Sequence, residues 1–287
     1  MVSLWASEQN GRRVCDGCVP NSKRDFFVKV DVHYRNHTFN TNDQARCGGT
    51  IISRHTVITA AHCVVIKDST VTRIEINYKD FTTRIDSSLF FDKKAGLAIT
   101  KSGTENDFQK HLIVHPGYNE RLHFLYDIAL INFQPEKFQQ ESVLPLCKAK
   151  DIHTHMRILG LFKKIKGQPP ADLIQKGRKF LEGKKTSLVQ EKEVHESVDN
   201  VSCNPKLGLT NFYKPALHLC LHGPNTHYGD SGGPVFSAEP YPGKKGEYKY
   251  KPVCLFGVLS GVTLLGNELA TRVSATSDWI EENMKTN

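Results

Sequence analysis

The chain has 287 residues, and an excess of Lys and Arg over Asp and Glu gives it a formal charge of +8. Hydrophobic residues make up 39% of the sequence, so the chain is expected to fold around a core and not to stay disordered. No run of eighteen apolar residues occurs, which excludes an ordinary membrane-spanning helix, and no membrane contact is expected. The positive charge is not interleaved with aromatic residues as in single-strand binders, so a nucleic-acid partner is not expected either.

The cysteines and two glycosylation acceptors indicate the compartment. Eight cysteines, an even number, are scattered over the whole length instead of being gathered in metal-style pairs, which favours disulfides. Asn36 and Asn200 each begin an N-x-S/T tripeptide. Together these features predict a secreted, extracellular glycoprotein, although the apolar run at residues 1–6 is too short to be a signal peptide, so none is visible.

The predicted elements are mostly short strands. Residues 1–24 are polar and are expected to form an N-terminal arm or a processed segment, and the domain follows over 25–287. Its first strand is predicted where apolar and polar residues alternate over 26–32. Further strands are expected at residues 49–52, 71–78, 112–114, 128–133, 156–161, 217–221, 234–237 and 253–260. Many short strands separated by turns are typical of an all-β sandwich or barrel.

Helices and charged segments are fewer. A helix is expected at 277–284, where acidic residues occupy the first turn, and a weaker helical pattern covers 171–181. The basic region 163–192 is predicted to be a solvated loop, and a surface for an acidic partner is the alternative. The Lys-, Gly-, Pro- and Tyr-rich segment 238–252 is expected to form a long surface hairpin.

Three motifs supply a base, an acid and a hydroxyl in one order along the chain. They are T-A-A-H-C at 59–63, D-I-A-L at 127–130 and G-D-S-G-G-P at 229–234. A serine hydroxyl becomes a useful nucleophile only when an imidazole takes its proton, and a buried carboxylate must then hold that imidazole in one tautomer. The candidates for nucleophile, base and acid are Ser231, His62 and Asp127.

The glycines around Ser231 predict an oxyanion-binding turn. They allow the backbone N–H groups of Gly229 and Ser231 to face one point, where a carbonyl oxygen would become negative. Asp230, beside the nucleophile, is better placed as an internal salt-bridge partner than as a base. No metal or other cofactor is expected in this chemistry.

With these motifs the chain resembles the trypsin- and chymotrypsin-like serine endopeptidases, from about residue 26 to its end. The resemblance implies an all-β fold of two six-stranded antiparallel barrels with a C-terminal helix and a catalytic cleft between the barrels. The first barrel is expected at about 25–145, the second at about 155–273 and the helix at about 275–285. The order His, Asp, Ser distinguishes this family from other hydrolases that use the same groups.

The resemblance also implies disulfides. Cys47 with Cys63 matches the bridge that closes the histidine loop, and Cys203 with Cys220 matches the bridge before the nucleophile. Cys147 resembles the cysteine that tethers the N-terminal segment, so its expected partner is Cys15 or Cys18. The other member of that pair is then left with Cys254.

Activation by cleavage is expected from the resemblance, but the usual R-I-V-G-G is absent. The best local match is Arg13 followed by Val14. If the chain is cut there, the new amine of Val14 could pair with Asp230 and organise the oxyanion turn.

The substrate pocket departs from the trypsin pattern. Asn225 stands where trypsin-like members carry an Asp, so a plain preference for Lys or Arg is not expected. The substrate-binding strand would be Ser260-Gly261-Val262, and Glu268 would lie near the pocket wall. A carboxylate there could restore affinity for basic side chains, whereas a solvated Glu268 on a remodelled loop is the simpler alternative.

The sequence therefore predicts a secreted serine endopeptidase that acts through an acyl-enzyme and has unusual specificity for the residue before the cleaved bond. The alternative is a catalytically weak or inactive protease-like protein that binds or regulates a partner. The expected partners of the enzyme are a protein or peptide substrate, with a protein inhibitor or an activating protease as further candidates, and the chain is expected to be a monomer.

Overall fold

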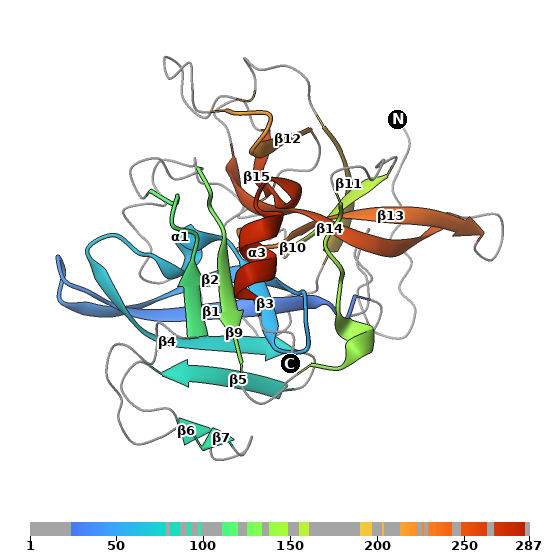
Figure 1. The fold of residues 1–287 in the computed structure, drawn as a ribbon. Coiled ribbons are helices and arrows are strands. Elements are labelled where there is room, and N and C mark those ends of the chain that lie inside the picture. The colour runs from blue at the N-terminus through green and yellow to red at the C-terminus, as the bar shows by residue number, and fades with distance from the viewer. Residues whose placement is uncertain are drawn as a thin grey trace, which may run out of the picture.

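The chain folds into two antiparallel β-structures that lie side by side, one from each half of the sequence (Figure 1). This computed structural model describes residues 24–78, 81–86, 91–92, 97–98, 111–119, 125–133, 138–148, 155–160, 190–196, 203, 213–222, 226, 229–242, 248–262 and 267–284. The predicted arm, the helical pattern at 171–181 and nearly all of the basic segment lie outside these residues. The all-β prediction is confirmed.

The first half forms a seven-stranded sheet with the order β5-β4-β1-β2-β3-β9-β8. Its strands are β1 (Phe27–Asn36), β2 (Thr41–Ile51), β3 (Thr56–Thr59), β4 (Ser69–Tyr78), β5 (Phe81–Asp86), β8 (Leu112–Val114) and β9 (Ala129–Asn132). The sheet has one strand more than expected because β5 pairs with the outer side of β4. The short strands β6 (Phe91–Asp92) and β7 (Leu97–Ala98) form a separate two-stranded sheet.

The second half closes into a six-stranded barrel with the order β10-β11-β12-β15-β14-β13. Its strands are β10 (Met156–Gly160), β11 (Gln190–Glu196), β12 (His218–His222), β13 (Pro234–Pro242), β14 (Tyr248–Val262) and β15 (Glu268–Arg272). The sequence prediction missed β11 and β15. Each of these six strands pairs with a neighbour on both sides, and only the outer part of β13 and β14 extends beyond the closed barrel.

Helices are short in the part of the chain that the structure describes. α1 (Ala61–Val64) is a single turn after β3, and α3 (Ser277–Asn283) follows the 3-10 turn η6 (Val273–Ala275), close to its predicted position. A second 3-10 turn, η3 (Gln140–Ser142), precedes the second barrel. None of the helices described is long and apolar enough to cross a membrane.

One hydrophobic core runs through both halves. It includes Val30, Ile58 and Ile131 of the first sheet together with Phe236 and Val258 of the second barrel. Ile280 of α3 is fully buried in the same cluster, so the terminal helix seals the junction between the halves. Such shared packing fixes the relative position of the two halves, because displacing one would expose apolar surface of both.

Three disulfides connect described residues. Cys47 with Cys63 and Cys203 with Cys220 pair as predicted. The prediction for Cys147 is wrong, because Cys147 pairs with Cys254, 107 residues away. The neighbouring bridge between Leu146 and Leu255 brings the two cysteines together. Cys15 and Cys18 therefore cannot bond to either of them, and both lie outside the described residues.

The hairpin of β13 and β14 projects from the side of the second barrel, as predicted for 238–252 (Figure 1). Its base is held by the Cys147–Cys254 disulfide and by Arg157, whose guanidinium lies 4.2 Å from the centre of the Tyr250 ring. Tyr241, near the tip, is 46% exposed.

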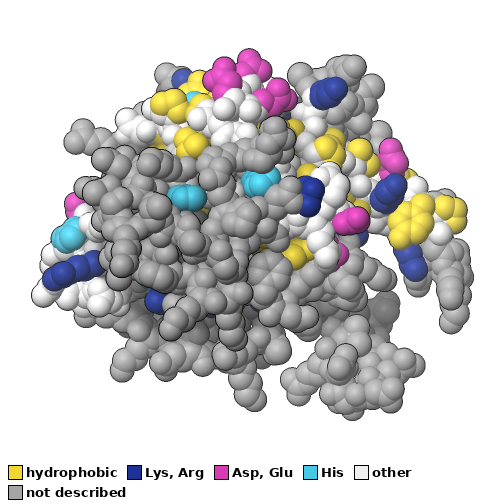
Figure 2. Space-filling model, turned by 60° about the horizontal axis from the view of Figure 1, so that its bottom comes forward, with side chains coloured by type: hydrophobic (Ala, Val, Ile, Leu, Met, Phe, Trp, Pro, Cys, Tyr) yellow, Lys and Arg dark blue, Asp and Glu magenta, His cyan; other side chains and the backbone are white. Residues whose placement is uncertain are grey.

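Charged side chains of the described residues are scattered on the one face that Figure 2 shows. On the face shown in Figure 2, Lys and Arg side chains stand singly among acidic, apolar and neutral ones and do not gather into one basic patch. The predicted acceptor Asn36 ends β1, where its side-chain oxygen accepts a hydrogen bond from Phe39 N. Its glycosylation stays a prediction, and Asn200 lies outside the described residues.

Candidate active site

His62 is presented by the one-turn helix α1, which directly follows β3 of the first sheet. The Cys47–Cys63 disulfide ties this helix to β2, and Thr59 Oγ1 donates a hydrogen bond of 2.8 Å to Gly48 O in the same strand. The preceding strand β3 is entirely buried. These restraints leave little freedom to the backbone that carries the imidazole.

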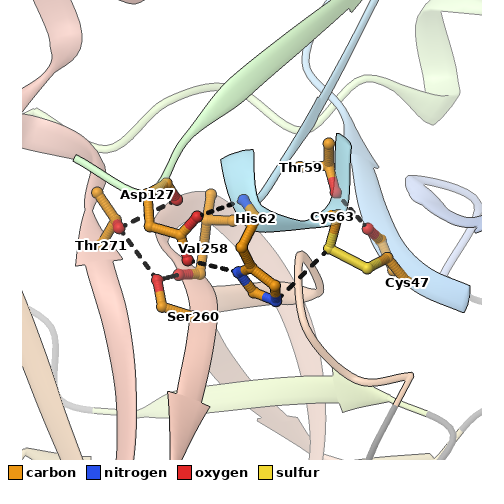
Figure 3. A network of polar contacts seen from close by, with 9 residues as sticks. Cys47, Thr59, His62, Cys63, Asp127, Val258, Ser260 and Thr271 are labelled. Carbon is orange, nitrogen blue, oxygen red and sulfur yellow. Dashed lines mark hydrogen bonds and ion pairs between the residues drawn. A yellow bond between two sulfur atoms is a disulfide. The ribbon is translucent and has the colours of Figure 1, made fainter. Parts of the chain in front are cut away.

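Asp127 lies against His62 in the arrangement expected of an acid–base pair (Figure 3). Its Oδ2 is 2.7 Å from His62 Nδ1, and its Oδ1 accepts a second hydrogen bond of 2.8 Å from His62 N. The Asp127 side chain is fully buried, whereas that of His62 is 28% exposed. Bonding at Nδ1 leaves Nε2 as the ring nitrogen that can exchange a proton with a substrate or a serine.

The charge state of His62 follows from two opposing effects. Burial lowers the pKa of the imidazole, but the charge of Asp127 and its hydrogen bond raise it more, so the pKa lies above its ordinary 6.5. Such a group accepts a proton readily during a reaction near neutral pH.

A hydroxyl pair from the second barrel supports Asp127, and the sequence prediction missed it. Thr271 Oγ1, on β15, donates to the backbone oxygen of Asp127 at 3.2 Å and lies 3.1 Å from Ser260 Oγ, on β14 (Figure 3). Ser260 was predicted only as a pocket residue. Thr271 belongs to no motif, and only the pairing of β14 with β15 brings it to the site.

Ser231 lies in a turn that contacts the first sheet. Its backbone oxygen accepts a 2.7 Å hydrogen bond from Gly48 N. Gly232 has a φ of +79° and Gly229 a φ of +101°, a region that disfavours other residues. A Cβ on Gly232 would lie only 2.2 Å from Thr59 Oγ1 and 2.4 Å from Gly48 O, so the turn packs directly against the chain leading to His62.

The third contact of a catalytic triad is absent from the described residues. The structure gives no hydrogen bond between Ser231 Oγ and His62 Nε2, and Nε2 instead lies 3.9 Å from Cys63 Sγ (Figure 3). Catalytic hydrogen bonds are often long or misaligned before substrate binds, so this geometry does not exclude the pair. The structure therefore brings base, acid and serine turn together, and the catalytic roles stay predictions.

One cluster of side chains has ligand atoms close enough together to bind a metal ion, but they are not of the right chemical kind. Ligand atoms of Cys47, His62 and Cys63 lie within 4.8 Å of one another. The two sulfurs are bonded to each other, so they cannot act as thiolate ligands. Within the described residues this group does not fit a metal ion.

Glu268, predicted at the pocket wall, is fully buried at the start of β15, so the solvated alternative is wrong. Its Oε1 accepts a 3.0 Å hydrogen bond from Thr226 N, and its Oε2 has no hydrogen-bond partner among the described residues. Burial is the main reason why its pKa rises from 4.5 to about 7, while backbone hydrogen bonds and Lys192 oppose the rise. The carboxyl therefore lies between β15 and the segment that leads to Ser231.

The remaining predicted residues are placed in part. Gly261 and Val262 continue β14, and Val262 pairs with Glu268. Asp230 is 1% exposed, as expected of an internal ion-pair partner. Asn225, Arg13 and Val14 lie outside the described residues, so the pocket floor and the activation site stay predictions.

Known proteins with similar sequences are serine proteases and related factors. The chain is 26% identical over 249 residues to the clotting factor G beta subunit of Tachypleus tridentatus and covers 70% of that protein. It is 28% identical over 262 residues to the serine protease grass of Drosophila melanogaster and covers 60% of it. A third relative, phenoloxidase-activating factor 3 of Holotrichia diomphalia, is 27% identical over 248 residues, with 64% covered. These alignments span 82–84% of the present chain.

Solved structures agree on the fold. The structure of GrC superimposes with a TM-score of 0.58 at 16% identity and covers 93% of this chain, and HL collagenase gives 0.55 at 17% identity with the same coverage of this chain. The superpositions cover 97% and 96% of those two proteins. The family model for trypsin matches residues 19–280, and the chain therefore belongs to the trypsin family.

Proposed function

We propose that this chain is an active serine endopeptidase that cleaves peptide bonds through an acyl-enzyme on Ser231. The observation that carries the proposal is the buried Asp127 carboxylate, which binds both Nδ1 and the backbone N–H of His62. This pair fixes the tautomer that leaves Nε2 free to take the serine proton. Ser231 Oγ would attack the peptide carbonyl as Nε2 takes its proton, and that proton would pass to the leaving amine as the C–N bond breaks and the acyl-enzyme forms. Water activated by the same imidazole would then hydrolyse the ester and free Ser231.

The turn around Ser231 supplies the second part of the proposal. Its position is supported by the hydrogen bond from Gly48 and by the close packing of Gly232 on Thr59. In this proposal the N–H groups of Gly229 and Ser231 stabilise the oxyanion. The loss of one such donor typically costs about 2.7–4 kcal/mol of transition-state stabilisation.

We propose that Glu268, in the wall of the substrate pocket, provides the negative charge of that pocket. Glu268 is buried beside Thr226, five residues before the proposed nucleophile, and within the described part of the chain its second oxygen has no hydrogen-bond partner. A basic substrate side chain could compensate that carboxylate, while Asn225 offers no charge from the floor. The proposed specificity therefore differs from the plain Lys or Arg preference of trypsin.

Secretion and protein partners complete the proposal. Three disulfides among the described residues suit an oxidising compartment. The printed names of two relatives describe a clotting factor and a phenoloxidase-activating factor, which supports a protein substrate or an activating protease as partner. These relatives are longer than the matched region, so their whole activities are not transferred to this chain.

Labelling with a fluorophosphonate tests the proposal, because the probe reacts only with an activated serine. We expect labelling of the purified protein and hydrolysis of a peptide panel, before or after limited trypsin treatment, and loss of both in Ser231→Ala. Ser237→Ala, which alters a buried serine on β13, is the matched control and should retain both activities. Absence of labelling in every form would contradict the proposal.

That negative outcome would favour the second candidate, a protease-like binding protein. The observation on its side is the direction of His62 Nε2, which lies near Cys63 Sγ and makes no hydrogen bond to Ser231 among the described residues. Binding of a partner by Ser231→Ala as tightly as by the unchanged protein would then identify its role.

A further inference from the structure

Lys192 projects into the second barrel although the sequence predicts it in a solvated loop. It lies on β11 directly opposite Ile158 of β10. Ile158 is fully buried in the barrel core, as is Val194, two residues beyond Lys192. Residues opposite each other across a ladder, and residues two apart along a strand, share a face. The lysine is therefore on the inward face, and it is half-buried.

Glu268 projects into the same barrel from the other side of β12. It lies opposite Leu221, and Ala270 stands two residues along β15. Both neighbours belong to the core cluster that contains Ile158 and Val194. Lys192 and Glu268 thus come from the two strands that flank β12 and share the interior of the barrel.

Asp230 brings a second carboxylate to this end of the barrel. It is buried in the turn that carries Ser231, and its backbone oxygen accepts a 3.0 Å hydrogen bond from Gly233 N. A Cβ on Gly233 would lie 2.7 Å from Leu159 O, so the turn rests on β10. Leu159 is the residue after Ile158, the cross-strand partner of Lys192.

The three charges act on one another. Burial lowers the pKa of Lys192, and the charges of Asp230 and Glu268 both act in the opposite direction. In return, Lys192 lowers the pKa of Glu268, which Asp230 raises. Carboxylates taken out of water are costly unless a cation or hydrogen bonds compensate them. An inward lysine beside two buried carboxylates supplies that compensation from within the barrel.

We propose that Lys192 is a positioning residue, whose ammonium is the internal counter-cation of Asp230 and Glu268 and holds the Ser231 turn in its reactive form without a freed N-terminus. The inference rests on the proposed peptidase activity. It assigns to Lys192 the task that the amine of Val14 would otherwise perform at Asp230. In this role Lys192 acts through the turn and not on the reacting atoms.

The test uses the full chain with Arg13→Gln, which blocks cleavage at the expected activation site. We expect Ser231 to be labelled by fluorophosphonate in this background, and Lys192→Met to slow the labelling by roughly 100-fold, the size of loss that follows removal of an oxyanion-hole donor. Lys192→Arg, which keeps the charge, should restore most of the rate. With a peptide substrate the loss should fall on kcat and leave KM nearly unchanged, because Lys192 holds the turn and not the substrate.

Lys29→Met is the matched control. Lys29 is another half-buried lysine whose pKa is lowered by burial, but it lies on β1 in the first sheet. Its replacement should leave the labelling rate unchanged. Lys192→Gln serves as a second neutral variant in case Lys192→Met does not fold, and circular dichroism checks each protein.

The outcomes separate the inference from the proposed function. Labelling of a folded neutral variant at the rate of its parent would overturn the inference. The inference would also be overturned if the unmodified chain were labelled only after cleavage and the Arg13→Gln protein were never labelled. The proposed function would stand in that case. If no form is labelled under any condition, the proposed function itself fails and the inference fails with it.

Discussion

Replacing Glu268 by glutamine removes a carboxyl that is fully buried in the folded chain and exposed in the unfolded one. The folded protein holds this proton up to a pKa of about 7, whereas the ordinary value is 4.5. Between these values the unfolded state binds fewer protons than the folded state, so stability falls as pH rises. At 1.36 kcal/mol for each pKa unit, the unfolding free energy that Glu268 contributes at low pH, and that is lost once the pH exceeds about 7, is at most about 3 kcal/mol.

Glu268→Gln should therefore abolish this part of the pH dependence. From about pH 5 to about pH 8.5 the unchanged protein should lose up to about 3 kcal/mol more unfolding free energy than the variant, or roughly 5–10 °C in melting temperature. Thermal and urea unfolding at several pH values measure the difference. Glu239→Gln, an exposed carboxyl on β13, is the control and should parallel the unchanged protein. Parallel curves for Glu268→Gln would refute the reasoning.

Three further changes test the rest of the site. Asp127→Asn should slow fluorophosphonate labelling by roughly 10⁴-fold. It should also lower the pH midpoint of the labelling rate, because the charge of Asp127 that raises the pKa of His62 is lost while burial still lowers it. An unchanged pH profile across neutral pH would contradict this. Gly232→Ala should lower the melting temperature and abolish labelling, because its methyl group would lie 2.2 Å from the nearest oxygen, and wild-type values would show that the turn is not so confined. The double variant Cys147→Ala, Cys254→Ala removes the disulfide that joins residues 107 apart. The free energy of unfolding measured in urea should fall by about 2–5 kcal/mol. An unchanged urea midpoint would show that this disulfide does not stabilise the fold.

The sequence correctly predicted those strands and helices whose own residues show a clear local pattern. The apolar run Leu112–Val114 is a strand with the expected limits, and the helix at Ser277 begins where its acidic first turn indicated. The histidine, aspartate and serine motifs are local in sequence, although residues of β2 such as Cys47 and Gly48 help to hold the histidine and serine motifs in place. The chemistry of these motifs named Asp127 as the carboxylate that holds His62, and the two side chains lie 2.7 Å apart.

Strand β11 could not be read from its sequence because its polar residues are satisfied by distant partners. Gln190–Glu196 contains three glutamates and a lysine, a composition typical of a solvated loop. In the fold, Glu191 is buried because Arg24 donates to it at 2.7 Å and Arg157 binds its other oxygen. No local sequence pattern predicts these contacts, because Arg24 and Arg157 are 167 and 34 residues away from Glu191.

The partner of Cys147 was missed for a related reason. A cysteine in this sequence context was assigned to the N-terminal segment by its resemblance to a known tether. Its true partner, Cys254, lies on β14, and the backbone of residues 145–147 hydrogen-bonds to Leu255 there. Pairing at that separation depends on how the connection between the halves crosses the second barrel, which no short motif encodes.

Each half of the molecule hydrogen-bonds the backbone of a proposed triad residue that belongs to the other half. Asp127 belongs to the first half, yet its backbone oxygen is bound by Thr271 of the second barrel. Ser231 belongs to the second half, yet its backbone oxygen is bound by Gly48 of the first sheet. The distance between His62 and Ser231 is therefore set by the junction of the two halves. Since Glu268 lies three residues before Thr271 on β15, a substrate side chain that engages Glu268 would act on the same strand that steadies the acid of the proposed triad.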